Sequence, residues 1–515
     1  MLRAMLRPSR SFWFGAVYVG LAAWLVFRVA QSYGASTGFT SLIAFGDRHE
    51  ATRIAAVDSV PVYTYQESYG YDGQFYAQIA VAGNPFNPEL RRALDLPAYR
   101  TRRILLPLVT HVVGLGRPGW ILTAYALANL ACWLALAGLL ARWWFPPGSV
   151  HDLLRWVGSL FGAGMLVSVC RSLTDAPALL LIAAAVRSIE VNRKRLAAGF
   201  LAAAGLVREA SVVAATAFGW PSRAAGRPPA KTLLLATIAV LPAVVWAAVV
   251  AAHFRTVKAT SLGAPLTGLA AGLAHIHATA RTAGLLAARN DILVVAAFLV
   301  QAGFLLSLLR RRPAHPWWRI AVAVTILIFL TDRDPWADLF STVSRVTLPL
   351  TLAFNVLVPR SRGGLVLLLL GNLTVPLAPT VLAIVETDQG PRVQGIGCAF
   401  ASGFHDAETD GTRSWRWTRG SATLRIENHR SASARATLEF DIDSPTDRTV
   451  SVQAGALEQT IALEPRRRVH VRFGPILAPP GSTVVRMTTG EPPWIEPGGD
   501  RRPLAFSVRD LRLAF

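Results

Sequence analysis

Asp72 is the first residue whose surroundings suggest chemistry, because it opens a run of small, polar and aromatic residues that ends at Tyr76 (DGQFY). If a helix begins near Asp72, the carboxylate lies in its first turn, where the helix dipole stabilises the charged form. Phe75 and Ile79 would then share an apolar face suited to a membrane surface. The pattern predicts an ionised carboxylate at the bilayer edge, where a lipid phosphate and a soluble hydroxyl can meet. The alternative is that Asp72 only caps the helix.

Three arginines follow at positions 100, 102 and 103, where the chain enters the apolar segment 104–115. This stretch is predicted to lie on the outer side of the membrane, where loops carry few basic residues. A guanidinium group matches phosphate oxygens with two parallel hydrogen bonds. Arg102 and Arg103 are therefore predicted to bind a lipid phosphate. An equally good alternative is that they extend to the lipid headgroups.

Charged residues also lie inside apolar segments, where they are costly and so suggest a functional site. Asp175 stands four residues after Arg171, the Arg208–Glu209 pair interrupts one apolar run, and Arg345 follows an outer loop. These residues are predicted to line a substrate site. The alternative for each is an ion pair between helices, and for Arg171 with Asp175 this alternative is slightly favoured.

Metal and nucleotide chemistry have little support in the sequence. Asp47 and Asp72 together offer oxygen ligands for a divalent cation, which is the one cofactor the sequence suggests. The chain contains 3 cysteines, too widely spaced for a disulfide framework or a zinc site. It has no phosphate-binding glycine loop and no HExxH pattern, so ATP-driven transport and zinc proteolysis are not predicted.

The elements that carry these residues are mostly membrane helices. The chain has 515 residues, of which 52% are hydrophobic and 16% charged, whereas soluble proteins have about one quarter charged residues. Apolar stretches of membrane-spanning length recur up to residue 385 and then stop. We therefore predict a membrane domain over 1–388, with an outer first loop at 31–103, and a soluble domain over 395–515. The net charge of +21 comes largely from basic clusters between apolar segments, so nucleic-acid binding is not predicted.

About ten to eleven spans are predicted. Basic residues near the start place the N-terminus in the cytoplasm, and the interrupted segment is either one span or two half-helices that turn at Arg208. Counting it as a turning pair places the C-terminal domain in the periplasm or outside the cell. The predicted segments are 12–29, 120–141, 153–170, 175–190, 196–220, 232–253, 291–309, 319–332, 338–358 and 364–385.

In the C-terminal domain, the spacing of apolar residues differs from that in the membrane domain. Polar and apolar residues alternate over 423–427, 437–442, 449–452 and 468–473, and turn residues separate these runs. Such short, alternating strands predict an all-β sandwich.

The segments 71–76, 99–107, 173–177 and 206–209 resemble the multi-spanning glycosyltransferases of the GT-C class. They are similar to bacterial relatives of the dolichyl-phosphate-mannose-dependent mannosyltransferases. Residues 415–418, together with residues 500–506, look like the periplasmic β-domain attached to some of these enzymes.

This resemblance implies an inverting transfer of a sugar from a polyprenyl-phosphate donor to a glycan, lipid or protein acceptor outside the cytoplasmic membrane. It implies that Asp72 is the general base and that Asp47 is a second acidic residue of the site. Gln74 and Tyr76, which belong to the same motif, are then expected to contact substrate.

Two other functions remain open. A transporter or flippase of lipid-linked sugars would use the same arginines without a base. Such proteins usually have broken helices in matched positions, whereas the sequence indicates only one break, at Arg208. The third candidate is a membrane scaffold whose β-domain binds envelope glycan.

Overall fold

The computed structural model describes residues 10–34, 37–65, 68–219, 230–254, 262–309, 315–382, 396–409, 414–428, 433–495 and 502–514. These residues fall into two compact units. The helical unit comprises the described residues of Met1–Ala30, Phe75–Val113 and Ala124–Leu382; the second comprises those of Gln31–Gln74, Gly114–Thr123 and Ala383–Phe515. The predicted boundary at 388–395 lies outside the described residues.

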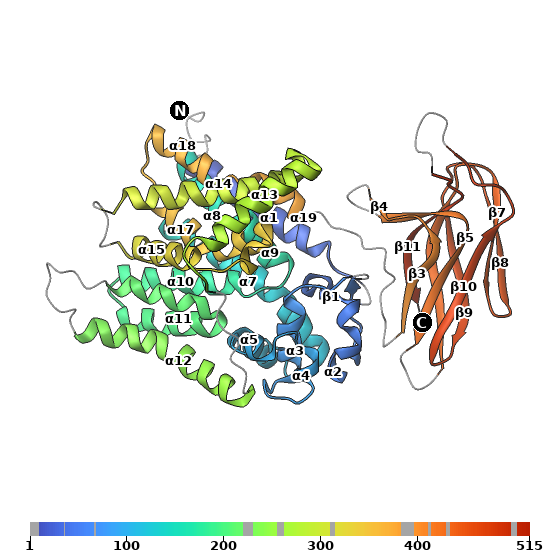
Figure 1. Cartoon of the computed structure of the whole chain (residues 1–515), viewed down its shortest axis with the longest axis horizontal. Coiled ribbons are helices and arrows are strands. Elements are labelled where there is room, and N and C mark those ends of the chain that lie inside the picture. The colour runs from blue at the N-terminus through green and yellow to red at the C-terminus, as the bar shows by residue number, and fades with distance from the viewer. Residues whose placement is uncertain are drawn as a thin grey trace, which may run out of the picture. The chain divides into compact units, whose positions relative to one another are not determined.

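Every apolar segment that the sequence predicts contains helix, so the predicted class, a polytopic helical membrane protein with a C-terminal β-domain, is confirmed (Figure 1). Among the described residues, 5 helices are long and apolar enough to cross a membrane. They are α1 (Arg10–Ala30, counted from Ser11), α7 (Pro118–Trp143), α12 (Ala230–Phe254), α14 (Leu285–Ser307) and the stretch Arg362–Leu382, which contains α18 (Arg362–Gly371), η8 (Val375–Leu377) and α19 (Ala378–Leu382).

Other predicted spans are bent or short. The pair α8 (Val150–Leu160) and α9 (Ala163–Cys170) bends by 47°, and Leu339–Val346 bends by 57° against α17 (Leu348–Leu357). Counting each bent pair as one span gives up to 7. The remaining segments are shorter helices: α10 (Asp175–Glu190), α11 (Lys194–Val207) with η4 (Glu209–Phe218), and α15 (Pro316–Phe329). The prediction of a single interrupted segment is therefore wrong, because local backbone bends leave no clear mark on apolar composition.

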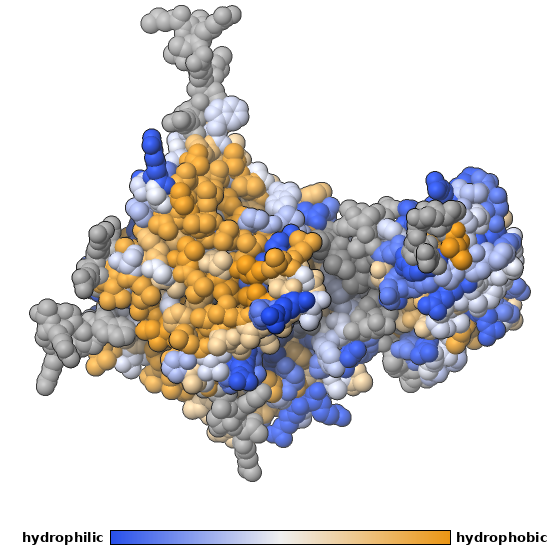
Figure 2. All heavy atoms as spheres, turned by 45° about the horizontal axis from the view of Figure 1, so that its top comes forward, coloured by the Kyte–Doolittle hydropathy of each residue, from blue (hydrophilic) through white to orange (hydrophobic). Residues whose placement is uncertain are grey.

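The surface of the helical unit is largely apolar. Only 11% of the most apolar stretch of α12 and 17% of that of α1 is buried within the protein, so these helices leave most of their side chains for lipid. Figure 2 shows this as a broad hydrophobic surface over the helices, in contrast to the largely hydrophilic surface of the β-strands. Neighbouring helices α10, α11 and α12 pack side by side, as do α15 and η4 (Figure 1).

Short helices and strands lie between α1 and α7, and further short helices follow α12 and α15. The first loop contains η2 (Thr40–Ile43), β1 (Phe45–Gly46), η3 (Asp47–Thr52), α2 (Ala55–Asp58) and β2 (Thr64–Tyr65). They are followed by α3 (Gly73–Ala82), α4 (Leu90–Ala93), α5 (Pro97–Arg100) and α6 (Leu105–Val113). Later connections contain α13 (Thr267–Ala283), η6 (Asp334–Trp336), the π-helical turn η7 (Leu339–Val343) and α16 (Ser344–Val346).

The C-terminal domain is an antiparallel β-structure with nine strands in its described residues. They are β3 (Ile396–Phe404), β4 (Glu408–Thr409), β5 (Ser414–Asn428), β6 (Ala434–Asp443), β7 (Arg448–Ala454), β8 (Leu457–Leu463), β9 (Val469–Ala478), β10 (Gly481–Thr489) and β11 (Ser507–Ala514). The strand order is β8-β7-β10-β5-β11-β6-β9, and β3 and β4 also pair with β5.

The long strand β5 links the two halves of this structure, because its C-terminal part pairs with β10 and its N-terminal part with β11. Buried residues alternate with more exposed ones along β6, and the inward side chains of both halves form one core. The four predicted alternating runs fall within β5, β6, β7 and β9, apart from residue 468 just before β9.

Candidate functional site

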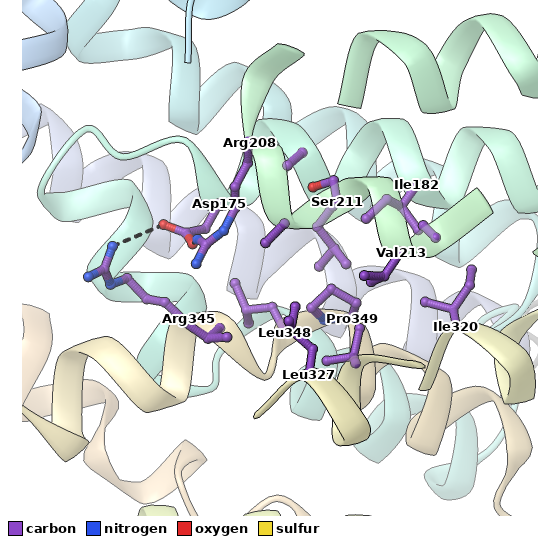
Figure 3. Close-up of a pocket in the computed structure, with 16 residues that line it drawn as sticks. Asp175, Ile182, Arg208, Ser211, Val213, Ile320, Leu327, Arg345, Leu348 and Pro349 are labelled. Carbon is purple, nitrogen blue, oxygen red and sulfur yellow. Dashed lines mark hydrogen bonds and ion pairs between the residues drawn. The ribbon is translucent and has the colours of Figure 1, made fainter. Parts of the chain in front are cut away.

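A buried carboxylate between two arginines is the most unusual feature of the helical unit. Asp175 is the first residue of α10, and its side chain is only 2% exposed. It forms one ion pair with Arg208 and another with Arg345, whose Nη1 lies 3.2 Å from Oδ2 of Asp175. Figure 3 shows the carboxylate between the two guanidinium groups. Between Arg171 and Asp175 the backbone is not helical throughout: α9 ends at Cys170, and Ser172 has a left-handed φ of 47° before α10 begins.

Arg208 reaches Asp175 because the chain breaks at this residue. Helix α11 ends at Val207, and Arg208 has an extended backbone conformation with φ −152° and ψ 116°. The 3₁₀ helix η4 then begins at Glu209. The predicted interruption at Arg208 is thus present, and it places two adjacent charged side chains in separate interactions: Arg208 with Asp175, and Glu209 with Arg103.

Arg345 is presented by an equally irregular segment. It lies in α16, directly after the π-helical turn η7, and the chain bends by 57° before α17. The Nε of Arg345 donates a hydrogen bond to the Ser341 carbonyl oxygen at 2.8 Å. This bond fixes the Arg345 side chain to η7. π-Helical turns are rare and occur often at functional sites.

Beside this cluster lies a second one, centred on Arg103. Its Nε and Nη2 donate to the two carboxylate oxygens of Glu209 at 2.8 and 2.9 Å. Its Nη1 and Nη2 also donate to the phenol oxygens of Tyr76 and Tyr99, at 2.7 and 2.5 Å. Most N–H groups of Arg103 are therefore occupied by the protein. Burial alone would lower the pKa of Arg103, but Glu209 and the two phenols raise it well above its usual value, so the group stays charged.

Arg100 extends the second cluster. It forms a two-pronged ion pair with Asp95, at 2.8 and 2.7 Å, and it donates to the Tyr76 phenol at 3.2 Å. Neither Tyr99 nor Asp95 is among the predicted site residues, although both belong to the same stretch as the arginines. Arg102 differs from its neighbours: it is half-buried, and no described group accepts a hydrogen bond from its Nε.

The charged trio lines one end of a pocket. Among the described residues, Asp175, Arg208 and Arg345 are the only ionisable ones that line this pocket. The rest of its lining is almost entirely apolar, including Ile182, Val213, Ile320, Leu327, Leu348 and Pro349 (Figure 3). The formal charge of the lining is therefore +1 in a space walled mostly by hydrocarbon.

Asp72, Asp47 and Gln74 belong to the second unit and are held in a compact loop. The Oε1 of Gln74 accepts from the Gly46 N–H at 3.1 Å, and its Nε2 donates to the Tyr69 carbonyl at 2.6 Å. Asp47 Oδ1 accepts from the Ser68 N–H at 3.0 Å. Asp72 is half-buried and directly precedes α3, as predicted from the sequence. Gln74 is fully buried, and its two hydrogen bonds stabilise this loop.

Two glycines allow the loop to close. A Cβ on Gly46 would lie 2.2 Å from the Gly70 nitrogen, and Gly70 itself has a left-handed φ of 67°. The segments Phe45-Gly46-Asp47 and Tyr69-Gly70-Tyr71 therefore pack directly on each other. Within the described parts of the chain, no group of three or more His, Cys, Asp or Glu side chains is placed to hold a metal ion.

Comparisons with solved structures give a structural likeness, whereas those with family models and curated proteins do not. No family model and no curated protein matches the sequence. Among solved structures, the chain is similar to the cryo-EM structure of arabinosyltransferase EmbB from Mycobacterium smegmatis, with 12% sequence identity and a TM-score of 0.30. The match covers 99% of this chain and 66% of the EmbB chain, so this chain spans less than two thirds of that protein's length.

Proposed function

We propose that this protein is a membrane glycosyltransferase of GT-C type. It transfers a sugar from a polyprenyl-phosphate donor to a glycan, lipid or protein acceptor on the outer side of the cytoplasmic membrane. The observation that carries this proposal is the position of Asp175, Arg208 and Arg345 at the charged end of an otherwise apolar pocket.

The charge of the pocket favours an anionic ligand. An unbalanced positive charge in a low-dielectric space is costly, and a bound anion would offset it. The planar, two-pronged guanidinium group suits phosphate oxygens in particular. The apolar walls formed by Ile320, Leu327 and Leu348 suit the hydrocarbon next to such a phosphate. A lipid phosphate combines both properties, whereas a soluble nucleotide-sugar has no apolar tail.

Asp175 has a supporting role in this proposal. Its carboxylate holds the two guanidinium groups apart and oriented, at a side-chain exposure of only 2%. Arg208 and Arg345 then offer their remaining N–H groups to the phosphate. As the bond between sugar and phosphate breaks, negative charge grows on the phosphate, and the fixed guanidinium groups stabilise it.

Arg103 and Glu209 are proposed to position the site, because most donors of Arg103 are already used by Glu209, Tyr76 and Tyr99. From the sequence, Arg103 and Arg102 are both predicted to contact the donor phosphate. Arg102, whose Nε has no described acceptor, is the better candidate of the two for a direct phosphate contact.

Asp72 is proposed as the general base. It accepts the proton of the acceptor hydroxyl while the hydroxyl oxygen attacks the anomeric carbon from the face opposite the phosphate. The bond from that carbon to the phosphate oxygen breaks, its electron pair leaves with the polyprenyl phosphate, and the sugar's configuration inverts. A positioned base of this kind typically contributes about 10²- to 10⁴-fold in rate. Asp47 and Gln74 shape the loop that carries Asp72.

A transporter of lipid-linked sugars is the second candidate, because the structure has bent or broken helices at α8–α9, α11–η4 and α16–α17. Broken helices are common around transporter substrate sites. A membrane scaffold with a glycan-binding β-domain is the third. Neither alternative requires cleavage of the bond between sugar and phosphate.

The test is to reconstitute the purified protein in liposomes with polyprenyl-phosphate sugars and envelope acceptors. The enzyme should release free polyprenyl phosphate and extend an acceptor, and Arg345→Met should abolish both. If the intact donor only crosses the bilayer, the protein is a transporter. If every donor stays unchanged on both sides, the scaffold is favoured.

A further inference from the structure

Helix α9 contacts the two elements that carry Asp175 and Arg345, although it contributes no residue to the lining of the pocket. Near its start, Gly164 lies directly against the backbone of Ser344 and Arg345. A Cβ on Gly164 would lie 2.1 Å from the Ser344 carbonyl oxygen and 2.7 Å from the Arg345 nitrogen. Contacts this short with backbone atoms leave no room for any side chain. The segment that presents Arg345 therefore rests on α9 at a glycine.

One turn further along α9, Ser168 is linked to the start of α10. Its Oγ accepts a hydrogen bond from the Ala176 N–H at 3.0 Å and donates one to Oδ1 of Asn129 at 3.1 Å. Ser168 and Asn129 are both fully buried. Ala176 directly follows Asp175, so this bond gives an acceptor to an N–H group in the first turn of α10. It also fixes the backbone that carries the Asp175 side chain.

Gly164 and Ser168 are four residues apart and so lie on the same face of α9. The interior of a packed helix is rigid compared with the irregular segments that it holds. We propose that Gly164 and Ser168 are positioning residues that set the separation of Arg345 and Asp175 for anion binding. The identity of the anion as a lipid phosphate rests on the proposed function; the positioning role does not.

Matched substitutions test this role in the full-length protein. Gly164→Ala would push away the backbone of Ser344 and Arg345, and Ser168→Ala would remove the bond to Ala176. Gly199→Ala is the control for the glycine, because a Cβ there meets nothing within 4 Å. Ser188→Ala is the control for the serine, because within the described residues that hydroxyl bonds only to the Ala184 carbonyl of its own helix.

The first measurement is binding of a synthetic polyprenyl phosphate without sugar, followed as a rise in the unfolding midpoint of protein in nanodiscs. Gly164→Ala and Ser168→Ala should weaken apparent affinity by at least about tenfold, the effect of disturbing one charged hydrogen bond. The two controls should stay within about twofold of the unchanged protein. If the unchanged protein binds and all four variants bind equally well, the positioning role is wrong.

A second measurement separates this inference from the proposed function. The loss of thermal stability caused by Gly164→Ala is measured alone and in combination with Arg345→Met. If Gly164 acts through Arg345, the two effects are not additive; additive effects contradict the inference, whatever the ligand is. A protein that shows this coupling but binds no polyprenyl phosphate would retain the positioning role and lose the proposed donor. Ser168→Ala with Arg345→Met replaces this pair if Gly164→Ala does not fold.

Discussion

The Nη1 atom of Arg345 lies 3.2 Å from Oδ2 of Asp175, although 170 positions separate the two residues in the sequence. Both side chains are almost completely buried. The two residues come from different irregular points of the helical unit: the start of α10 and the turn after η7. Their contact, together with the ion pair from Arg208, creates the positive end of the pocket.

The first prediction concerns the carboxylate of this trio. Asp175→Asn leaves two buried guanidinium groups facing each other without their shared anion. We expect the free energy of unfolding to fall by about 3–5 kcal/mol, the usual cost of breaking a buried ion pair from one side. Thermal unfolding in detergent measures this. Asp334→Asn, at an exposed position in η6, should have little effect.

Adding Arg208→Gln to Asp175→Asn removes one of the two repelling charges, so part of the lost stability should return. If Asp175→Asn is as stable as the unchanged protein, the trio is not the buried, mutually dependent cluster described above.

The second prediction concerns the donor phosphate. Arg345→Met removes a guanidinium group of the pocket while keeping much of its apolar volume. Binding of a polyprenyl phosphate should weaken by about 10- to 100-fold, because a charged hydrogen bond is lost. Arg333→Met, at an exposed position twelve residues earlier, is the control. Equal binding by both variants would place the phosphate elsewhere.

The third prediction distinguishes a positioning arginine from a phosphate ligand. Arg103→Lys keeps the positive charge but cannot make two parallel bonds to Glu209. We expect catalytic efficiency to fall by about 10- to 100-fold through misplacement of the site, while affinity for polyprenyl phosphate changes by less than about threefold. Arg91→Lys, on the exposed face of α4, should leave both quantities unchanged. A large loss of phosphate affinity in Arg103→Lys would make Arg103 a direct ligand.

The fourth prediction concerns the loop around Asp72. Gly70→Ala places a Cβ 2.4 Å from the Ala44 carbonyl oxygen at a left-handed backbone position. The conformation alone costs about 1–2 kcal/mol, and the collision adds to it. We expect faster limited proteolysis within 31–74 and a loss of transfer, with normal membrane insertion. Gly20→Ala, where a Cβ meets nothing within 4 Å, should behave as the unchanged protein does.

Much of the fold follows from the sequence, because the length of an apolar segment and the spacing of its apolar residues are local properties of the chain. The apolar runs correspond to helices, and the alternation at 437–442 corresponds to β6. The break at Arg208 is also local, since an arginine and a glutamate interrupt one apolar run.

The arrangement of the site was less predictable, for physical reasons. Pairing of Asp175 with Arg345 depends on packing between distant segments, and the nearer Arg171 was the obvious partner in sequence. The bends at α8–α9 and α16–α17 depend on close backbone contacts such as that of Gly164 with Ser344, which composition does not reveal. The role of Tyr99 as a partner of Arg103 depends on side-chain geometry in the same way.

The central claim is that a carboxylate at the start of α3 removes the acceptor proton while a lipid phosphate leaves. The most direct measurement is mass spectrometry of products formed by purified protein from polyprenyl-phosphate sugars and envelope acceptors. Asp72→Asn should reduce transfer by about 10²- to 10⁴-fold, with binding of polyprenyl phosphate and thermal stability unchanged. Asp58→Asn, at an exposed position in the same loop, should retain full transfer. An Asp72→Asn protein that transfers sugar at the normal rate would contradict the enzymatic account.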